Sequence, residues 1–209
     1  MSRTITDIRN AAQLIEVMQA GARPKYLFFW GHRAARDGRV TASCFSQWWP
    51  AEFQVDGIEY ASAEHYMMAE KAQLFGDDAI RAQILAARTP AEAKALGRKV
   101  AGFDDEHWER ERFAIVVAAN AAKFDQHVAL REFLVQTGDR VLVEASPVDV
   151  VWGIGLPAGH EDAERPESWR GLNLLGFALM EVRERLTKNR ITKEKEDEHP
   201  RADADQQVP

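Results

Sequence analysis

Hydrophobic positions follow two different periods along the chain, and each period predicts a different kind of element. Residues 6–20 have apolar side chains at a helical period and stop at Gly21, which predicts an amphipathic helix packed on the outside of the domain. Residues 26–30 form a short apolar run rich in aromatic side chains, which predicts a buried strand. Apolar residues around the Asp56-Gly57 turn, at positions 53–58, predict a hairpin, and residues 141–143 and 150–152 predict further short strands.

Helical periodicity dominates the middle of the chain. Ser62 is suited to cap a helix that ends at Gly76, and Thr89 with Pro90 has the pattern of a helix start. Helices are expected over residues 62–76, 77–87, 89–97, 104–124, 128–136 and about 172–186. Because strands lie near both ends of the chain and do not alternate with helices, the predicted fold class is α+β. We expect one helix-rich domain with a small sheet built from short strands near both ends.

The same patterns divide the chain into three parts. Residues 1–22 form an N-terminal helical extension, and residues 23–187 form the domain itself. Residues 188–209 carry many charges and almost nothing apolar, so we expect a disordered tail.

Composition excludes several classes of protein. Of the 209 residues, 45% are hydrophobic and 29% charged, and no apolar run approaches the length of a membrane span. With no secretory signal at the N-terminus, we expect a cytoplasmic protein without membrane contact. The lone Cys44 excludes an intramolecular disulfide and a cysteine-rich zinc site, and the scattered histidines lack metal-ligand spacing, so no metal is expected.

The net charge of −6 gives no overall attraction to a nucleic-acid backbone. This mildly favours a small phosphorylated substrate, although nucleic acid stays possible as a modified substrate. A local basic rim could be formed by Arg33, Arg36, Arg39 and Arg98.

The predicted helix over residues 62–76 carries the densest candidate chemistry. Glu64 and Lys71 share one helical face with Met67 and Met68. Such a face is either a surface stripe of ion pairs or the wall of a pocket, and the two methionines favour a partly buried wall. His65 alone is more typical of a core or capping histidine.

Aromatic residues and glycines supply further candidates. Trp30, Trp48 and Trp152 could stack on a nucleobase, or could simply fill the core. Asp149 precedes glycines that let a backbone approach a ligand, and Arg98 could bind a phosphate or satisfy a helix end. Spacing alone thus predicts a pocket with one or two carboxylates, a lysine and aromatic walls.

Several strings in a fixed order give a more specific indication. Over residues 26–186 the chain resembles the NADAR family, the YbiA-like N-glycosidases of riboflavin intermediates, in the strings FFWGH, CFSQWW, VDGIEYASAEHYMMAEKAQLFGD, LGRKVAGF, NAAKF, VLVEASPVDVVWGIG and WRGLNLLGFALMEVRERL. The resemblance implies a compact α+β, YbiA-like domain that cleaves N-glycosidic bonds without a cofactor. It implies two substrate classes: ribosylaminopyrimidine phosphates of riboflavin synthesis, and ADP-ribose attached to guanine in nucleic acid.

Site residues are carried over position by position. The resemblance implies catalytic roles for Glu64, Lys71 and Asp149. Glu64 would stabilise positive charge on the ribose or orient water, whereas Lys71 would either attack C1 or clamp a phosphate. Together with the aromatic and glycine patterns, it gives the substrate-binding set Phe29, Trp30, Trp48, His65, Arg98, Trp152, Gly153 and Asn173. Ala63 and the long loop over residues 156–170 depart from the family pattern and leave the substrate class open.

Two functions of other classes compete with this reading. One is a module that binds ADP-ribose or a nucleotide without catalysis, against which a carboxylate in the pocket argues. The other is a pure interaction protein, supported only by the charged tail.

Overall fold

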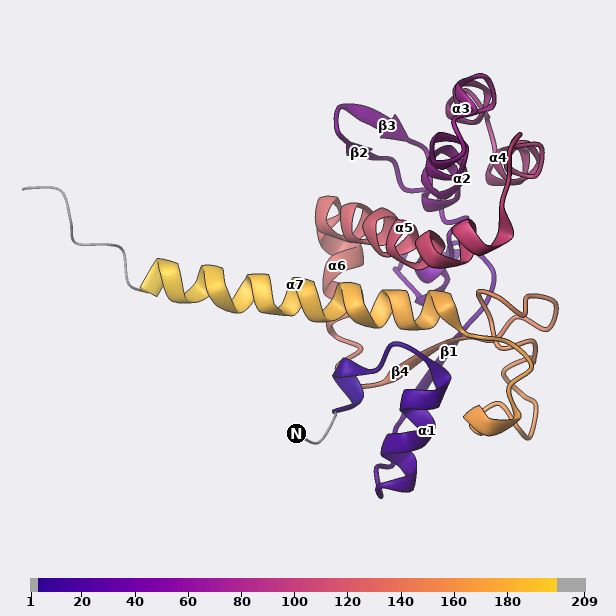
Figure 1. Ribbon diagram of the computed structural model, residues 1–209. Coiled ribbons are helices and arrows are strands. Elements are labelled where there is room, and N and C mark those ends of the chain that lie inside the picture. The colour runs from indigo at the N-terminus through magenta and orange to yellow at the C-terminus, as the bar shows by residue number, and fades with distance from the viewer. Residues whose placement is uncertain (1–3, 199–209) are drawn as a thin grey trace, which may run out of the picture.

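The computed structural model describes residues 4–198, apart from the side chains of residues 191 and 193–198. Its strands form two separate pairs (Figure 1). Strand β1 (Tyr26–Phe29) pairs in parallel with β4 (Val141–Glu144), whereas β2 (Phe53–Val55) and β3 (Ile58–Tyr60) form an antiparallel hairpin. The predicted strand over 26–30 and the hairpin around Asp56-Gly57 are both confirmed. The β1–β4 pair joins the two ends of the domain across more than a hundred residues of intervening chain.

Helices make up most of the fold. Their bounds are α1 (Ala11–Gln19), α2 (Ala63–Leu74), α3 (Asp78–Leu85), α4 (Pro90–Gly97), α5 (Asp105–Gln126), α6 (Val128–Val135) and α7 (Leu174–Glu198), with short 3₁₀ turns at Ile5–Asp7, Ala42–Phe45 and Pro166–Ser168. The capping predictions hold: the side chains of Ser62 and Thr89 accept hydrogen bonds from the backbone N–H groups of His65 and Glu92.

The prediction of one helix over residues 6–20 is wrong in its first half. A 3₁₀ turn at Ile5–Asp7 is followed by a break, and α1 begins only at Ala11. Asn10 caps this second start, because its side chain accepts a hydrogen bond from the backbone N–H of Gln13. A polar side chain that can cap a helix thus divides a segment whose apolar spacing is continuous.

The strand predicted over residues 150–152 is also wrong. Oδ1 of Asp149 accepts hydrogen bonds from the backbone N–H groups of Val151 and Trp152, at 2.9 and 2.8 Å. These two donors are therefore occupied within the loop and cannot join a ladder of hydrogen bonds.

Helix α7 continues past the expected end at residue 186. It runs to Glu198, so residues 188–198 are helical where the sequence predicts a disordered tail. Ion pairs between residues one turn apart, Arg185 with Glu181 and Lys188 with Glu184, lie on the turns that lead into this part of the helix. The remainder of the predicted tail, residues 199–209, lies outside the described residues.

Helix α7 crosses the middle of the molecule and joins its two halves (Figure 1). It packs against α5 on one side and against β4 on the other. Phe124 of α5, Leu142 of β4 and Phe177 of α7 are all fully buried, so the two halves share one core. No helix within the described residues combines the length and apolar character needed to cross a membrane.

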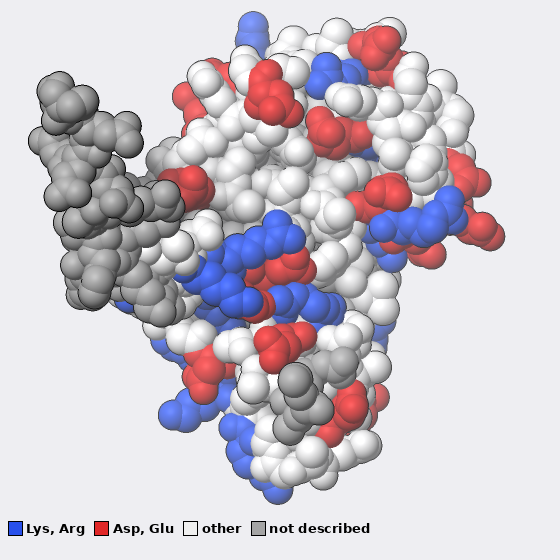
Figure 2. Space-filling view, turned by 60° about the vertical axis from the view of Figure 1, so that its left-hand side comes forward, with Lys and Arg blue, Asp and Glu red and all other residues white. Residues whose placement is uncertain are grey.

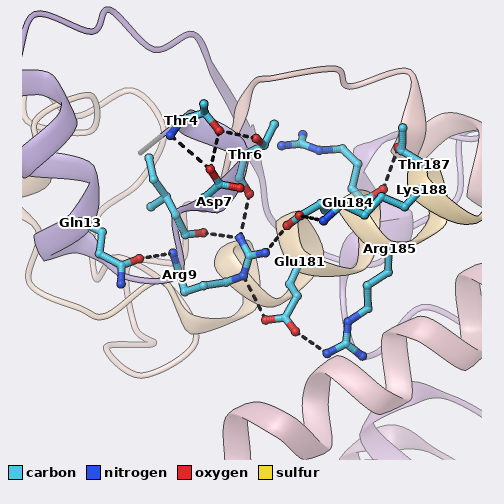
Figure 3. Close-up of polar contacts among 12 residues, drawn as sticks. Thr4, Thr6, Asp7, Arg9, Gln13, Glu181, Glu184, Arg185, Thr187 and Lys188 are labelled. Atoms are coloured by element: carbon cyan, nitrogen blue, oxygen red, sulfur yellow. Dashed lines mark hydrogen bonds and ion pairs between the residues drawn. The ribbon is translucent and has the colours of Figure 1, made fainter. Parts of the chain in front are cut away.

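The N-terminal extension is part of this core and not only a cover over it. Ile8 and Leu14 are both fully buried. Arg9 contacts both Glu181 and Glu184 of α7, with 3.1 Å between its Nε and Oε2 of Glu181 (Figure 3). Basic and acidic side chains are interleaved over one face of the molecule, as Figure 2 shows.

Candidate active site

The parallel pairing of β1 and β4 brings their carboxyl ends to one edge. Glu144 is the last residue of β4 and lies in register with Phe29, the last residue of β1. The loops that follow carry Trp30 from one strand and Asp149 from the other. Ligands in α/β proteins commonly bind beyond the carboxyl ends of parallel strands, and this edge is the place where the candidate residues gather.

Glu64 lies in the first turn of α2 and is almost completely buried. Its side chain is only 2% exposed, and Oε1 is buried without a hydrogen-bond partner. Burial raises the pKa of Glu64 to about 7, opposed by the charge of Lys94 and by a hydrogen bond from the Trp48 side chain, while Asp149 raises it further. The backbone N–H of Glu64 donates to the carbonyl of Gln47 at 3.0 Å, which ties α2 to the loop carrying Trp48. A buried carboxyl oxygen without a partner is rare in folded proteins, which makes Glu64 a candidate site residue.

A second carboxyl group, Glu144, reaches the same site from β4. Its Oε2 is buried and also has no hydrogen-bond partner. Burial raises the pKa of Glu144 to about 8, and the nearby charges of Asp149 and Glu64 add to this, whereas Lys94 opposes it. The sequence analysis missed Glu144. The one available signal was a polar residue ending the apolar run of a predicted strand.

Glu64, Glu144 and Asp149 together form what we call the carboxyl cluster. The charge of Asp149 raises the pKa of both glutamates, and the charge of Glu64 also raises that of Glu144, so the three groups lie within electrostatic reach of one another. Asp149 also orders its own loop, because its Oδ1 accepts the two backbone hydrogen bonds described above. The sequence analysis named Glu64 and Asp149 as candidates, and in the structure the charge of Asp149 acts on Glu64.

Positive charge comes to the cluster from α4. Lys94 lies 5.8 Å from the ring centroid of Trp48, and both Lys94 and Arg98 lower the pKa of Glu64. Helix α4 can approach α2 because residue 97 is glycine: a Cβ atom there would lie 2.1 Å from Sδ of Met68. The sequence named Arg98 but not Lys94, since nothing local indicates that α4 faces Glu64.

A buried lysine stabilises the loop that carries Trp48. Lys123 is fully buried, and its Nζ donates hydrogen bonds to the carbonyls of Cys44 and Ser46 at 2.6 and 3.0 Å. Burial lowers the pKa of Lys123 to about 7. The Trp48 ring meets the His32 ring at 5.5 Å between centroids, so the loops before α2 and after β1 adjoin.

Three of the predicted site residues make their contacts with groups outside the cluster. The amine of Lys71 lies 3.9 Å from the ring centroid of Phe103, and its charged neighbour is Asp105. The ring of Phe29 is buried in the core against Phe45. His65 is held by Ser62 at Nδ1 and by the Ala87 carbonyl at Nε2, as expected of a core or capping histidine.

Asn173 and Gly153 hold the backbone of Glu144. Asn173 is fully buried, its Oδ1 accepts from the Glu144 N–H and its Nδ2 donates to the Leu142 carbonyl, both at 2.9 Å. A Cβ at residue 153 would lie 2.8 Å from the Glu144 carbonyl oxygen, which accepts from the N–H of Ile154 at 3.0 Å. Both residues therefore support the carboxyl cluster by fixing the backbone of Glu144.

The two remaining predicted residues are tryptophans of the loops after β1 and β4. Trp30 is 63% exposed at the edge of the site, whereas Trp152 is half-buried and packs against the core. Within the described part of the chain, no group of three or more His, Cys, Asp or Glu side chains could hold a metal ion.

Comparisons with known proteins agree with this architecture. The NADAR domain model matches residues 28–187. The N-glycosidase R617 of Acanthamoeba polyphaga mimivirus is 43% identical over 166 residues, which cover 77% of this chain and 95% of the viral protein. The N-glycosidase Npun_R5314 of Nostoc punctiforme is 38% identical over 143 residues, covering 68% of this chain and 85% of that protein. The NMR structure of Escherichia coli YbiA superposes with a TM-score of 0.62 and 26% identity, over 91% of this chain and 96% of that one, which confirms the helix-rich α+β class.

Proposed function

The chain belongs to the NADAR domain family, and we propose that it hydrolyses the C1–N bond of a ribosylaminopyrimidine phosphate of riboflavin synthesis. The enzyme class is that of its relatives, which are named N-glycosidases. One observation carries the proposal for the site: Glu64 has a buried, unpartnered carboxyl oxygen at the same edge as two further carboxyl groups and Lys94.

The chemistry of the bond requires such a group. Breaking a C1–N bond builds positive charge on the ribose, and a fixed carboxylate in a site shielded from water stabilises that charge. The charge of Lys94 favours the ionised form of Glu64 despite its burial. Glu64 therefore stabilises the ribosyl cation and orients the attacking water.

The substrate is held by groups around the cluster. Lys94 and Arg98 bind its phosphate, and Trp48 provides a face on which the pyrimidine stacks. Oδ2 of Asp149 binds the ribose hydroxyls, while its Oδ1 orders the loop. Lys71 has no part in this proposal, since its amine lies against Phe103.

One observation favours a second candidate, removal of ADP-ribose from guanine in nucleic acid. Arg33, Arg36 and Arg39 are exposed in the loop that begins with Trp30 and His32, next to Trp48. A basic loop beside the site suits a larger, polyanionic substrate.

Mass spectrometry of the products tests both candidates. The purified protein is given a ribosylaminopyrimidine phosphate and an ADP-ribosylated guanine oligonucleotide in parallel. Release of ribose phosphate supports the proposal, and release of ADP-ribose with restored guanine supports the second candidate. Binding of ADP-ribose with no product from either substrate contradicts both and favours the non-catalytic module.

Replacing Glu64 tests its role in whichever reaction is found. We expect Glu64→Gln to lower kcat by about 10²–10³-fold, because the variant keeps the shape but removes the stabilising charge. Glu132→Gln, on the exposed surface of α6, is the matched control and should retain full activity. Turnover close to that of the unmodified protein in Glu64→Gln would remove Glu64 from the mechanism.

A further inference from the structure

Glu64 and Glu144 come from different elements, α2 and β4, and meet different surroundings. Glu64 lies at the N-terminus of α2, whose dipole favours an anion, and the foremost charge acting on it is that of Lys94. Glu144 ends a strand, has no such dipole, and the foremost charge acting on it is that of Asp149. The surroundings thus favour a carboxylate at Glu64 and a carboxylic acid at Glu144.

Resting on the proposed function, we propose that Glu144 is the proton donor to the departing base, and that Asn173 positions it. Oε2 of Glu144 is buried and has no hydrogen-bond partner, so no other group in the protein competes for a proton that it carries. The backbone of Glu144 is fixed on both sides, by the side chain of Asn173 at its N–H and by Ile154 at its carbonyl.

The proposed step balances as an acid-assisted hydrolysis. The protonated Glu144 gives its proton to the leaving nitrogen as the C1–N bond breaks, and the bonding electron pair stays with the base. Water adds to C1, and its released proton passes to the carboxylate of Glu64 and from there returns to Glu144 through solvent. The products are the free base and the ribose phosphate, with both carboxyl groups restored.

Both carboxyl groups can carry a proton near neutral pH, as this division of roles requires. Burial raises the pKa of Glu64 to about 7 and that of Glu144 to about 8, and the charge of Glu64 adds to the rise at Glu144. The two carboxyl groups therefore titrate near neutral pH, where the site can hold a proton for transfer. Carboxyl pairs whose surroundings separate their pKa values commonly divide acid and base roles in this way.

Substrates with different leaving groups test the proton transfer. A ribosylaminopyrimidine phosphate needs a proton on its leaving nitrogen, whereas an N-ribosylpyridinium phosphate releases a neutral base without one. We expect Glu144→Gln to lower kcat about 10²–10⁴-fold on the first substrate and less than about 10-fold on the second. Its activity on the first substrate should also lose the decline at high pH. Glu132→Gln should act on both like the unmodified protein.

The outcomes separate this inference from the proposed function. If the unmodified protein cleaves these substrates but Glu144→Gln slows both equally, the role as proton donor is wrong and the proposed function stands. If the unmodified protein cleaves neither, the proposed function is wrong, and the role of Glu144 falls with it.

A double variant tests Asn173. Residue 173 has φ of +53°, so Asn173→Gly removes both side-chain hydrogen bonds without adding backbone strain. We expect Asn173→Gly alone to show the leaving-group dependence of Glu144→Gln in weaker form. When it is combined with Glu144→Gln in one protein, it should cause little further loss of kcat. Losses that multiply in the double variant, or a loss independent of the leaving group, would show that Asn173 acts only on stability.

Discussion

At the scale of single residues, surroundings decide the charge state of the groups that matter most. Glu64, Glu144 and Lys123 are ordinary ionisable side chains whose pKa values burial moves toward neutrality. Lys123 keeps its place through two carbonyl acceptors, whereas each glutamate retains an unpartnered oxygen. Lys123 therefore supports the loop of Trp48, whereas the two glutamates each keep a carboxyl oxygen that no group of the protein binds.

Burial of Glu144 makes stability depend on pH with a definite sign. Its pKa rises from 4.5 to about 8, so the folded state holds more protons than the unfolded state between these values. The free energy of unfolding due to this group therefore falls as pH rises through that range, by at most about 1.4 kcal/mol per pH unit. Relative to the unmodified protein, Glu144→Gln should gain stability from pH ~5 to ~8 and level off above that range.

Denaturant unfolding at a series of pH values measures this difference. Comparison within one pair of proteins cancels the opposite contribution of Lys123, whose lowered pKa adds stability as pH rises above about 7. Glu132→Gln is the control and should give a constant difference. A constant difference for Glu144→Gln as well would mean that Glu144 ionises as an ordinary exposed glutamate.

At the scale of elements, glycines set how closely the supporting elements approach. Gly97 lets α4 lie against Met68 of α2, and Gly176 lets α7 lie against β4, where a Cβ would meet the Leu142 carbonyl oxygen at 2.1 Å. The contact of α4 with α2 places Lys94 near Glu64, and the contact of α7 with β4 places Asn173 next to β4. Close helix packing thus places both Lys94, the cation near the carboxyl cluster, and Asn173, which holds the backbone of Glu144.

Replacing Gly97 tests the contact between α4 and α2. Alanine is the better helix former, yet its methyl group would overlap Sδ of Met68, so we expect Gly97→Ala to destabilise the protein by about 1–3 kcal/mol. Activity should fall as well, because α4 carries Lys94 and Arg98. Gly159→Ala, which has open space around it, is the matched control and should change neither thermal stability nor kcat/KM. Unchanged stability in Gly97→Ala would show that α4 can shift without cost.

At the scale of the whole molecule, the N-terminal segment packs against helix α7 near the other end of the described chain. The N-terminal segment contributes Ile8 and Leu14 to the core and is fastened to α7 by Arg9 (Figure 3). Helix α7 in turn packs against β4, whose last residue is Glu144. The extension before the NADAR domain is therefore part of the folded unit that supports the site.

Truncation of Ile8 tests how strongly this extension stabilises the fold. We expect Ile8→Ala to lower the free energy of unfolding by about 2–5 kcal/mol, because it leaves a cavity at a fully buried position. The folded fraction should keep its kcat, since Ile8 contributes no side chain to the carboxyl cluster. Val128→Ala, 56% exposed, should change the free energy of unfolding by less than about 0.5 kcal/mol. An equally small change in the free energy of unfolding for Ile8→Ala would mean that the N-terminal segment is only loosely attached to the core.

Most elements of this fold could be predicted from local patterns, because their causes are local. Ser62 and Thr89 cap their helices, and Asp56-Gly57 turns its hairpin, through hydrogen bonds and backbone conformations within a few residues. The predictions failed where a side chain competed with the apolar period, as Asn10 does before α1 and Asp149 does at residues 150–152.

The sequence by itself determined the helix-rich α+β class, the family resemblance, and Glu64 and Asp149 as candidates. Only the tertiary structure decided that the charge of Lys94 acts on Glu64 and Glu144, and that the amine of Lys71 lies against Phe103. Parallel pairing of β1 with β4 and the approach of α4 to α2 join segments far apart in the chain, and no local pattern records those contacts. The surroundings that raise the pKa values of Glu64 and Glu144 arise from the same contacts, so they exist only in the folded protein.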